Sequence, residues 1–125
     1  MSKSAQDFLS EANSMVPSIA VAEALSLINS GKAVVIDVRD GKEIDQSGTV
    51  KNALRIPRGM IEFVADPTTS FYNNQISNDK EILVICGAGG MAALTGKTLM
   101  EMGYTNVHNA GGFSAWKDAG GPTED

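Results

Sequence analysis

The stretch from Glu81 to Gly103 constrains the fold more strongly than any other part of this chain of 125 residues. Five apolar residues in a row, Ile82 to Cys86, follow Glu81 and are typical of a buried strand. The glycine-rich loop Gly87-Ala88-Gly89-Gly90 comes next, and Met91 to Met102 is predicted to form a helix that ends at Gly103. A strand, a tight turn and a helix in this order form one unit of an α/β fold, and they predict a largely parallel sheet.

The rest of the chain shows the same alternation of helix and strand. A first short helix opens with the capping pattern Ser4-x-x-Asp7, and a second helix starts at Val21 and ends before Gly31. The polar stretch 66–80 is predicted to be a surface loop. Further strands are predicted at 33–38, at 53–56 and around Val107, and further helices near 60–64 and at 113–119.

The composition excludes several classes of protein. The chain has 15 acidic and 10 basic residues, one cysteine and one histidine. One cysteine cannot form an internal disulfide, and together with one histidine it cannot supply a cysteine-based zinc site. A net charge of -5 without a run of lysine or arginine argues against a face that binds nucleic acid or an anionic membrane. An anionic substrate must therefore be attracted by a local feature.

We expect no targeting or membrane-spanning segment in this sequence. Residues 15–22 mimic the end of a secretory signal, because they finish with Ala20-Val21-Ala22. The apolar spacing from Val21 to Ile28 instead predicts an amphipathic helix. The longest apolar run, Ile82 to Cys86, is far shorter than the roughly 20 residues that a membrane-spanning helix needs. We therefore expect a cytoplasmic protein.

Two nucleotide-binding interpretations of the glycine-rich loop fit the sequence poorly. Gly87, Gly89 and Ala92 match the short dinucleotide fingerprint, but no acidic residue stands near the end of the next predicted strand, at 107–110. Gly96-Lys97-Thr98 resembles part of a phosphate-binding loop. The glycine that this motif needs five positions earlier is absent, and the three residues fall inside the predicted helix.

A third interpretation places the chemistry on Cys86. This residue ends a predicted parallel strand, where α/β sheets bind ligands. Glycines allow the following backbone N–H groups to point at one spot, and such a nest at a helix N-terminus would stabilise a thiolate. The alternative is a buried, inert cysteine. The candidate donors are the amides of Gly87, Ala88, Gly89, Gly90, Met91 and Ala92.

Several motifs occur in the order found in one known family. They are Asp37-Val38-Arg39 with Glu43, Gly48 to Ala53 with Ile56-Pro57, Cys86-x-x-Gly89-x-Met91, and Gly111-Gly112-Phe113-x-Ala115-Trp116. Over residues 19–122 the chain therefore resembles the rhodanese family of sulfurtransferases. The resemblance implies one rhodanese-like domain at 19–125 after an N-terminal helical extension at 1–18, with a mainly parallel sheet flanked by helices on both faces.

The resemblance also implies an activity. The Cys86 thiolate would take a sulfane sulfur from thiosulfate or another donor, form a persulfide, and pass the sulfur to a thiophilic acceptor. The expected partners are a small anionic donor or a protein persulfide, and a thiol or cyanide as acceptor, with no metal or organic cofactor. A rhodanese-like binding or persulfide-carrier module with little thiosulfate turnover is the alternative.

Two positions depart from the family pattern. Met91 replaces an arginine that commonly ends the active loop, which removes a positive charge, and Thr49 replaces a histidine with an expected structural effect only. Phosphatases with a related loop need an arginine at the position of Ala92, so hydrolysis of phosphate esters is not expected.

Auxiliary roles are predicted for a few charged residues. Arg58 follows a predicted strand end and is a candidate to supply the charge that Met91 lacks. Asp37 is predicted to hydrogen-bond loop backbone, and Arg39 is expected to pair with Glu43. We expect no catalytic role for His108, because no orienting partner is evident.

Overall fold

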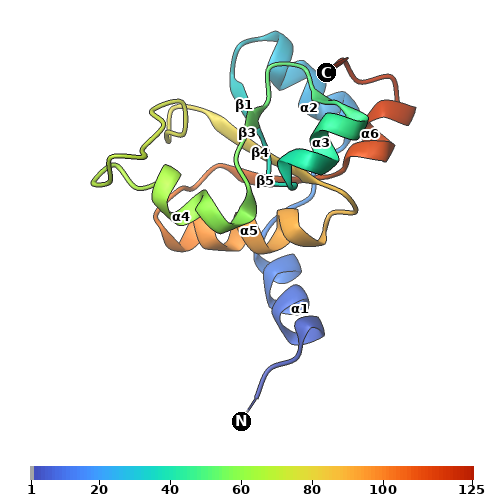
Figure 1. Cartoon of the computed structure of the whole chain (residues 1–125). Coiled ribbons are helices and arrows are strands. Elements are labelled where there is room, and N and C mark those ends of the chain that lie inside the picture. The colour runs from blue at the N-terminus through green and yellow to red at the C-terminus, as the bar shows by residue number, and fades with distance from the viewer. Residues whose placement is uncertain (1) are drawn as a thin grey trace.

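The computed structural model describes residues 2–125, and its centre is a four-stranded sheet in the order β3-β1-β4-β5 (Figure 1). These strands are β1 (Ala33–Asp37), β3 (Leu54–Arg55), β4 (Glu81–Cys86) and β5 (Val107–Gly112). Every neighbouring pair is parallel, so the carboxyl ends of the strands lie at the same edge of the sheet. The predicted α/β class with a parallel sheet is confirmed.

Helices cover both faces of this sheet (Figure 1). On one side lie α1 (Ala5–Met15), α4 (Ile61–Val64) and α5 (Gly90–Glu101), and on the other lie α2 (Val21–Asn29), α3 (Gly41–Ser47) and α6 (Phe113–Asp118).

Because successive side chains of a strand point to opposite faces, β1 and β4 supply two separate cores. One core contains Val34, Ile36, Ile82, Val84 and Leu99, and the other contains Val35, Leu83, Ile85, Phe113 and Trp116.

The predicted elements differ from the structure mainly at their ends. The strand predicted at 33–38 ends at Asp37, and the one predicted at 53–56 is the shorter β3. The helix predicted near 60–64 is a 3-10 turn, η1 (Arg58–Met60), followed by the single turn of α4. Helix α5 begins at Gly90, one residue earlier than predicted, because Gly89 has a φ of 97° and serves as its N-cap.

Three short elements were not predicted. They are α3 and the antiparallel pair of β2 (Thr49–Val50) and β6 (Thr123–Glu124). Helix α3 buries a single aliphatic residue, Ile44, so the sequence shows no helical repeat of apolar residues there. Its first turn is capped by the Asp40 side chain. The two strands are two residues long and pair residues more than 70 positions apart. Local sequence carries no signal of such a pairing.

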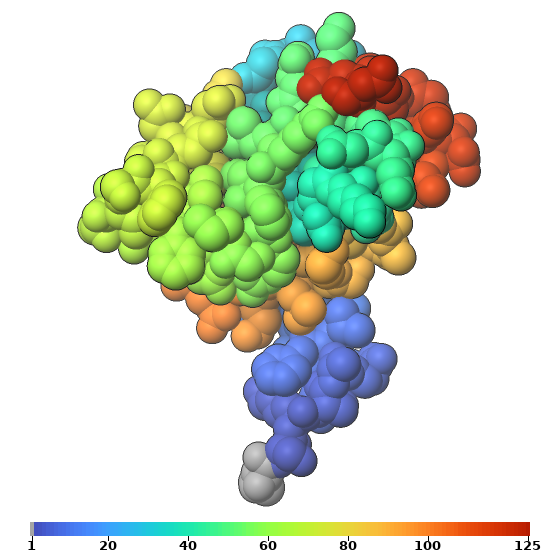
Figure 2. Space-filling model, in the orientation of Figure 1, coloured from blue at the N-terminus to red at the C-terminus, as the bar shows by residue number. Residues whose placement is uncertain are grey.

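Helix α1 extends from the body of the molecule and is attached through α5 (Figure 2). Ser4 and Asp7 form the predicted capping box, in which the Asp7 amide donates to Ser4 Oγ and the Ser4 amide donates to the Asp7 carboxylate. The Ser4 amide, followed by the Ser4 hydroxyl, lowers the pKa of the Asp7 carboxylate. Gly96 allows the chain after α1 to approach α5 closely, because a Cβ on Gly96 would lie 2.8 Å from Val16 Cγ1.

Candidate active site

Cys86 is the last residue of β4 and is buried. Its Sγ accepts hydrogen bonds from the backbone amides of Gly89 (2.9 Å) and Ala92 (3.3 Å). Helix α5 starts between these two donors, so its positive end also lies beside the sulfur. Two amides and a helix N-terminus favour a negatively charged sulfur at this position.

The loop amides predicted as donors divide into two groups. The amides of Gly89 and Ala92 reach the sulfur, whereas within residues 2–125 no bond to it is found from the other four. The other four amides belong to Gly87, Ala88, Gly90 and Met91. The Met91 side chain is partly exposed. The position at which the family motif has an arginine is therefore open to solvent in this chain.

The residues before α3 form a buried ionic cluster. The Asp37 carboxylate accepts bonds from the Arg39 guanidinium (2.8 Å), the Arg39 amide (3.0 Å) and Thr49 Oγ1 (2.7 Å). Arg39 also donates to the Gly48 carbonyl and lies over the ring of Phe113, at 4.6 Å from its centroid. Every charge in this cluster is therefore paired, as burial requires.

The cluster refines two predictions. Asp37 bonds the amide of Arg39 in its own turn, and within the described residues it makes no bond to the loop that follows Cys86. Arg39 forms the predicted ion pair with the half-exposed Glu43 at 3.8 Å, but it also pairs with Asp37, which is closer at 2.8 Å. Asp37 is the closer partner of Arg39 because its carboxylate is buried at the end of β1, where a cation is needed to neutralise it.

Arg39 also contributes to the electrostatics of the site, which sequence reasoning missed. The Asp37 hydrogen bond is the main reason why the pKa of Arg39 is raised, and charge interactions with Glu43 and Cys86 raise it further. A carboxylate oxygen of Glu43 lies 3.4 Å from where a Cβ on Gly87 would stand. The loop therefore has a buried cation and an exposed anion as neighbours.

Within residues 2–125, Arg58 and His108 bond groups other than the Cys86 sulfur. The Arg58 guanidinium bonds Glu62 (3.1 Å) and Thr98 (3.0 Å), and with Met91 it lines an open groove along α5 of about 620 Å³. Its charge is thus partly neutralised by Glu62. His108 lies 3.2 Å from Glu81, at the end of β4 opposite to Cys86.

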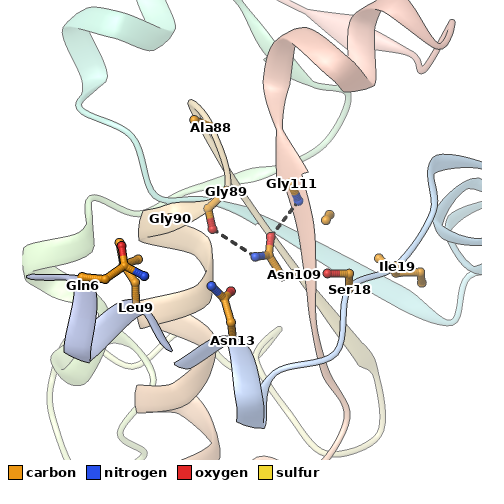
Figure 3. A pocket seen from close by; sticks show the side chains of 11 residues that line it. Gln6, Leu9, Asn13, Ser18, Ile19, Ala88, Gly89, Gly90, Asn109 and Gly111 are labelled. Atoms are coloured by element: carbon orange, nitrogen blue, oxygen red, sulfur yellow. Dashed lines mark hydrogen bonds between the residues drawn. The ribbon is translucent and has the colours of Figure 1, made fainter. Parts of the chain in front are cut away.

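Strand β5 supports the loop from the side (Figure 3). The Asn109 side chain donates to the Gly89 carbonyl (3.0 Å) and accepts from the Gly111 amide (2.8 Å). Gly112 lies so close to the loop that a Cβ there would be 2.4 Å from the Gly87 oxygen. Sequence reasoning did not select Asn109; the only local signal was an amide residue two positions before the Gly111-Gly112 pair.

A cavity of about 450 Å³ separates this loop from α1 (Figure 3). Its wall is mostly neutral, with Gln6, Leu9 and Asn13 from α1, Ser18 and Ile19, and Ala88 to Gly90 and Asn109 to Gly111 from the loop and β5. Among the described residues, no group of three or more histidine, cysteine or carboxylate side chains is placed to hold a metal ion. In the same part of the chain, no helix is long and apolar enough to cross a membrane.

A model of the rhodanese-like domain family matches residues 20–119. The chain belongs to the rhodanese-like family. This confirms the resemblance seen in the sequence motifs. The matched region contains the whole of β4, the loop after Cys86 and the supporting strand β5.

Relatives within the family include named sulfurtransferases. Human thiosulfate:glutathione sulfurtransferase is 27% identical over 107 residues, which are 80% of this chain and 92% of that protein. An adenylyltransferase and sulfurtransferase from Candida albicans is 32% identical over 91 residues. The match covers 72% of this chain, but the chain spans only 20% of that protein's length.

A solved structure matches nearly the whole chain, including the N-terminal helix. It is a protein of unknown function from Rhodopseudomonas palustris, described as a possible tyrosine phosphatase, with 37% sequence identity and a TM-score of 0.89. The match covers 99% of this chain and 96% of that one.

Proposed function

We propose that this rhodanese-like protein is a sulfurtransferase that carries a sulfane sulfur on Cys86 as a persulfide. The donor is thiosulfate or a persulfide, and the acceptor is thiophilic. The observation that carries the proposal is the pair of amide hydrogen bonds to Cys86 Sγ at the start of α5. An inert packing cysteine needs no such donors, whereas a thiolate nucleophile is stabilised by them.

The proposed reaction has two displacements. In the first, the Cys86 thiolate attacks the outer sulfur of thiosulfate, a new S–S bond forms, the old one breaks, and sulfite leaves with the electron pair. In the second, an acceptor thiolate or cyanide attacks the outer sulfur of the persulfide, and the Cys86 thiolate leaves. No external oxidant, reductant or cofactor enters either step. The loop amides stabilise the anionic sulfur at the beginning and end of each cycle.

Hydrolysis of phosphate esters is not supported, although the Rhodopseudomonas palustris protein is described as a possible tyrosine phosphatase. A phosphoryl group needs cationic stabilisation of its equatorial oxygens. In this chain the two positions at the end of the loop are the uncharged Met91 and Ala92. The Arg58 charge is partly neutralised by its ion pair with Glu62. The loop therefore offers amide donors but no arginine of its own.

A persulfide carrier with little thiosulfate turnover is the second candidate. It is favoured by Met91 at the mouth of the loop and by the Glu43 carboxylate beside Gly87, both unfavourable for a small dianion. The net charge of -5 adds to this repulsion. In that case a thiol-bound donor would load Cys86 more readily than thiosulfate does.

The test is sulfur transfer from thiosulfate to cyanide, measured as thiocyanate. We expect activity in the wild-type protein and background activity in Cys86→Ser, because a hydroxyl is a far weaker nucleophile than a thiolate. Phe71→Ala is a suitable control, since Phe71 is 59% exposed on the distant loop 66–80. Wild-type activity in Cys86→Ser would contradict the proposal. Activity with a persulfide donor alone would favour the second candidate.

A further inference from the structure

Gly89 donates a hydrogen bond to the Cys86 sulfur, but its own backbone conformation needs support from neighbouring groups. Its amide makes the shorter bond to Cys86 Sγ, at 2.9 Å, yet its backbone has a φ of 97°. The Gly89 amide and the Gly89 carbonyl belong to two successive peptide groups, and these meet at a glycine Cα, which has the greatest backbone freedom of any residue. The direction of the amide is therefore fixed only if rotation about that Cα is restricted. The Gly89 carbonyl must therefore be held in place.

Two donors hold that carbonyl. One is the amide of Ala93, at 3.1 Å, which is the first hydrogen bond of α5. The other is the side-chain amide of Asn109, at 3.0 Å, which comes from outside the loop and its helix (Figure 3).

Asn109 is in turn firmly anchored. It is 9% exposed and is paired with Val84 across the β4–β5 ladder. Its backbone amide donates to the Pro17 carbonyl (2.8 Å), and its carbonyl accepts from the Ile19 amide (3.0 Å). Its side-chain oxygen accepts from the Gly111 amide (2.8 Å). The sheet thus presents a fixed donor to a glycine of the loop.

We propose that Asn109 is a positioning residue: by holding the Gly89 carbonyl, which belongs to the peptide after Gly89, it limits rotation about the Gly89 Cα, so that the Gly89 amide of the preceding peptide points at the Cys86 sulfur and stabilises the thiolate. Position 109 needs a donor and an acceptor in one short side chain, and asparagine provides both. An aspartate would keep the acceptor for Gly111 but would turn a carboxylate towards the Gly89 carbonyl. The inference rests on the proposed role of Cys86 as the reactive thiol.

The chain contains a matched control. Asn78 bridges two backbone groups in the same way, because its Nδ2 donates to the Gly103 carbonyl (3.2 Å) and its Oδ1 accepts from the Thr105 amide (3.0 Å). These contacts connect the loop before β4 to the segment after α5, at the amino end of the sheet and away from Cys86. Asn78→Asp therefore makes the same chemical change without touching the active loop.

The experiment measures how the rate of Cys86 alkylation by iodoacetamide depends on pH, in the absence of any sulfur donor. We expect the midpoint of the profile to rise by about one pH unit in Asn109→Asp, which corresponds to a roughly tenfold lower thiolate fraction below the midpoint. A smaller rise is expected in Asn109→Ala, which removes the donor without adding charge. Asn78→Asp should keep the wild-type midpoint.

Each outcome decides the proposal. A rise in both Asn109 variants and none in Asn78→Asp supports it. An unchanged midpoint in Asn109→Ala overturns it, even if Asn109→Asp shifts, because charge alone would then explain the aspartate result. If Asn109→Asp does not fold, Asn109→Ala decides by itself. Because alkylation needs no sulfur transfer, a protein that fails the thiocyanate assay can still pass or fail this test.

Discussion

Met91 is the side chain that most clearly separates this chain from the family pattern. It is 39% exposed at the start of α5, where an arginine would add a fixed positive charge to the loop. Anion attraction now depends on two amides, the end of α5 and the buried Arg39, whose charge is mostly satisfied by Asp37. Thiosulfate binding should accordingly be limited by electrostatics.

Met91→Arg should lower the KM for thiosulfate by about fivefold, the range expected for one exposed charge interaction. The gain should shrink at high salt, because exposed charges are screened. Met91→Gln is the control, since it changes polarity without adding charge and should leave KM near the wild-type value. Initial rates over a range of thiosulfate concentrations provide the measurement. An equal gain in both variants would show that charge is not the limiting factor.

The sequence predicted the residues of the site better than their contacts. Cys86 and Gly89 are three positions apart in one short loop, so a local sequence motif was enough to select them. Arg39 forms the predicted pair with Glu43 at 3.8 Å, but its closer partner is Asp37 at 2.8 Å, which the sequence did not indicate. Only burial of Asp37 decides between them, and burial depends on the whole fold.

At the scale of elements, the active loop depends on its contact with β5. Strand β5 pairs with β4 in parallel, and the register shifts between Val84 and Ile85, so that Asn109 and Gly111 both lie beside the loop. Gly112 then passes under the Gly87 carbonyl with no room for a side chain. The end of β5 and the loop are therefore packed as one unit.

Gly112→Ala should displace the loop, because the new Cβ would lie 2.4 Å from the Gly87 oxygen and 3.2 Å from the Ala88 Cα, both backbone atoms. We expect sulfur transfer to fall by at least about tenfold, with a loss of about 1–3 kcal/mol in the free energy of unfolding. Gly41→Ala is the control, since no atom lies within 4 Å of a Cβ there. Thiocyanate formation and urea unfolding are the two measurements. Wild-type rates in Gly112→Ala would refute the packing argument.

Helices and strands could be predicted where the apolar pattern of their own residues is strong enough to mark them. The apolar run of β4 and the helix after it needed no tertiary information. Helix α3 has one buried aliphatic side chain, and β2 and β6 exist only because Thr49 and Glu124 meet across the fold. The support from Asn109 belongs to the same class, because it joins residues 20 positions apart.

At the scale of the whole molecule, the parallel sheet places the Cys86 sulfur, the proposed reactive atom, at the carboxyl edge of a central strand. The two cores pack against both faces of β4, the Arg39 charge interacts with Cys86, and Asn109 donates to the loop at the Gly89 carbonyl. The alternation of elements along the sequence predicted this architecture, because it is repeated over most of the chain. The chain has no second thiol. Any sulfur bound covalently as a persulfide must therefore be on Cys86.

The most direct test of the account is the intact mass of the protein after incubation with a sulfur donor and removal of the excess. We predict the addition of one sulfur atom, located on Cys86 by peptide mapping, after treatment with thiosulfate or a small-molecule persulfide. The added mass should disappear on addition of cyanide, with one thiocyanate formed per sulfur lost. A protein that gains no sulfur from either donor, although its thiol is alkylated normally, would contradict the central claim.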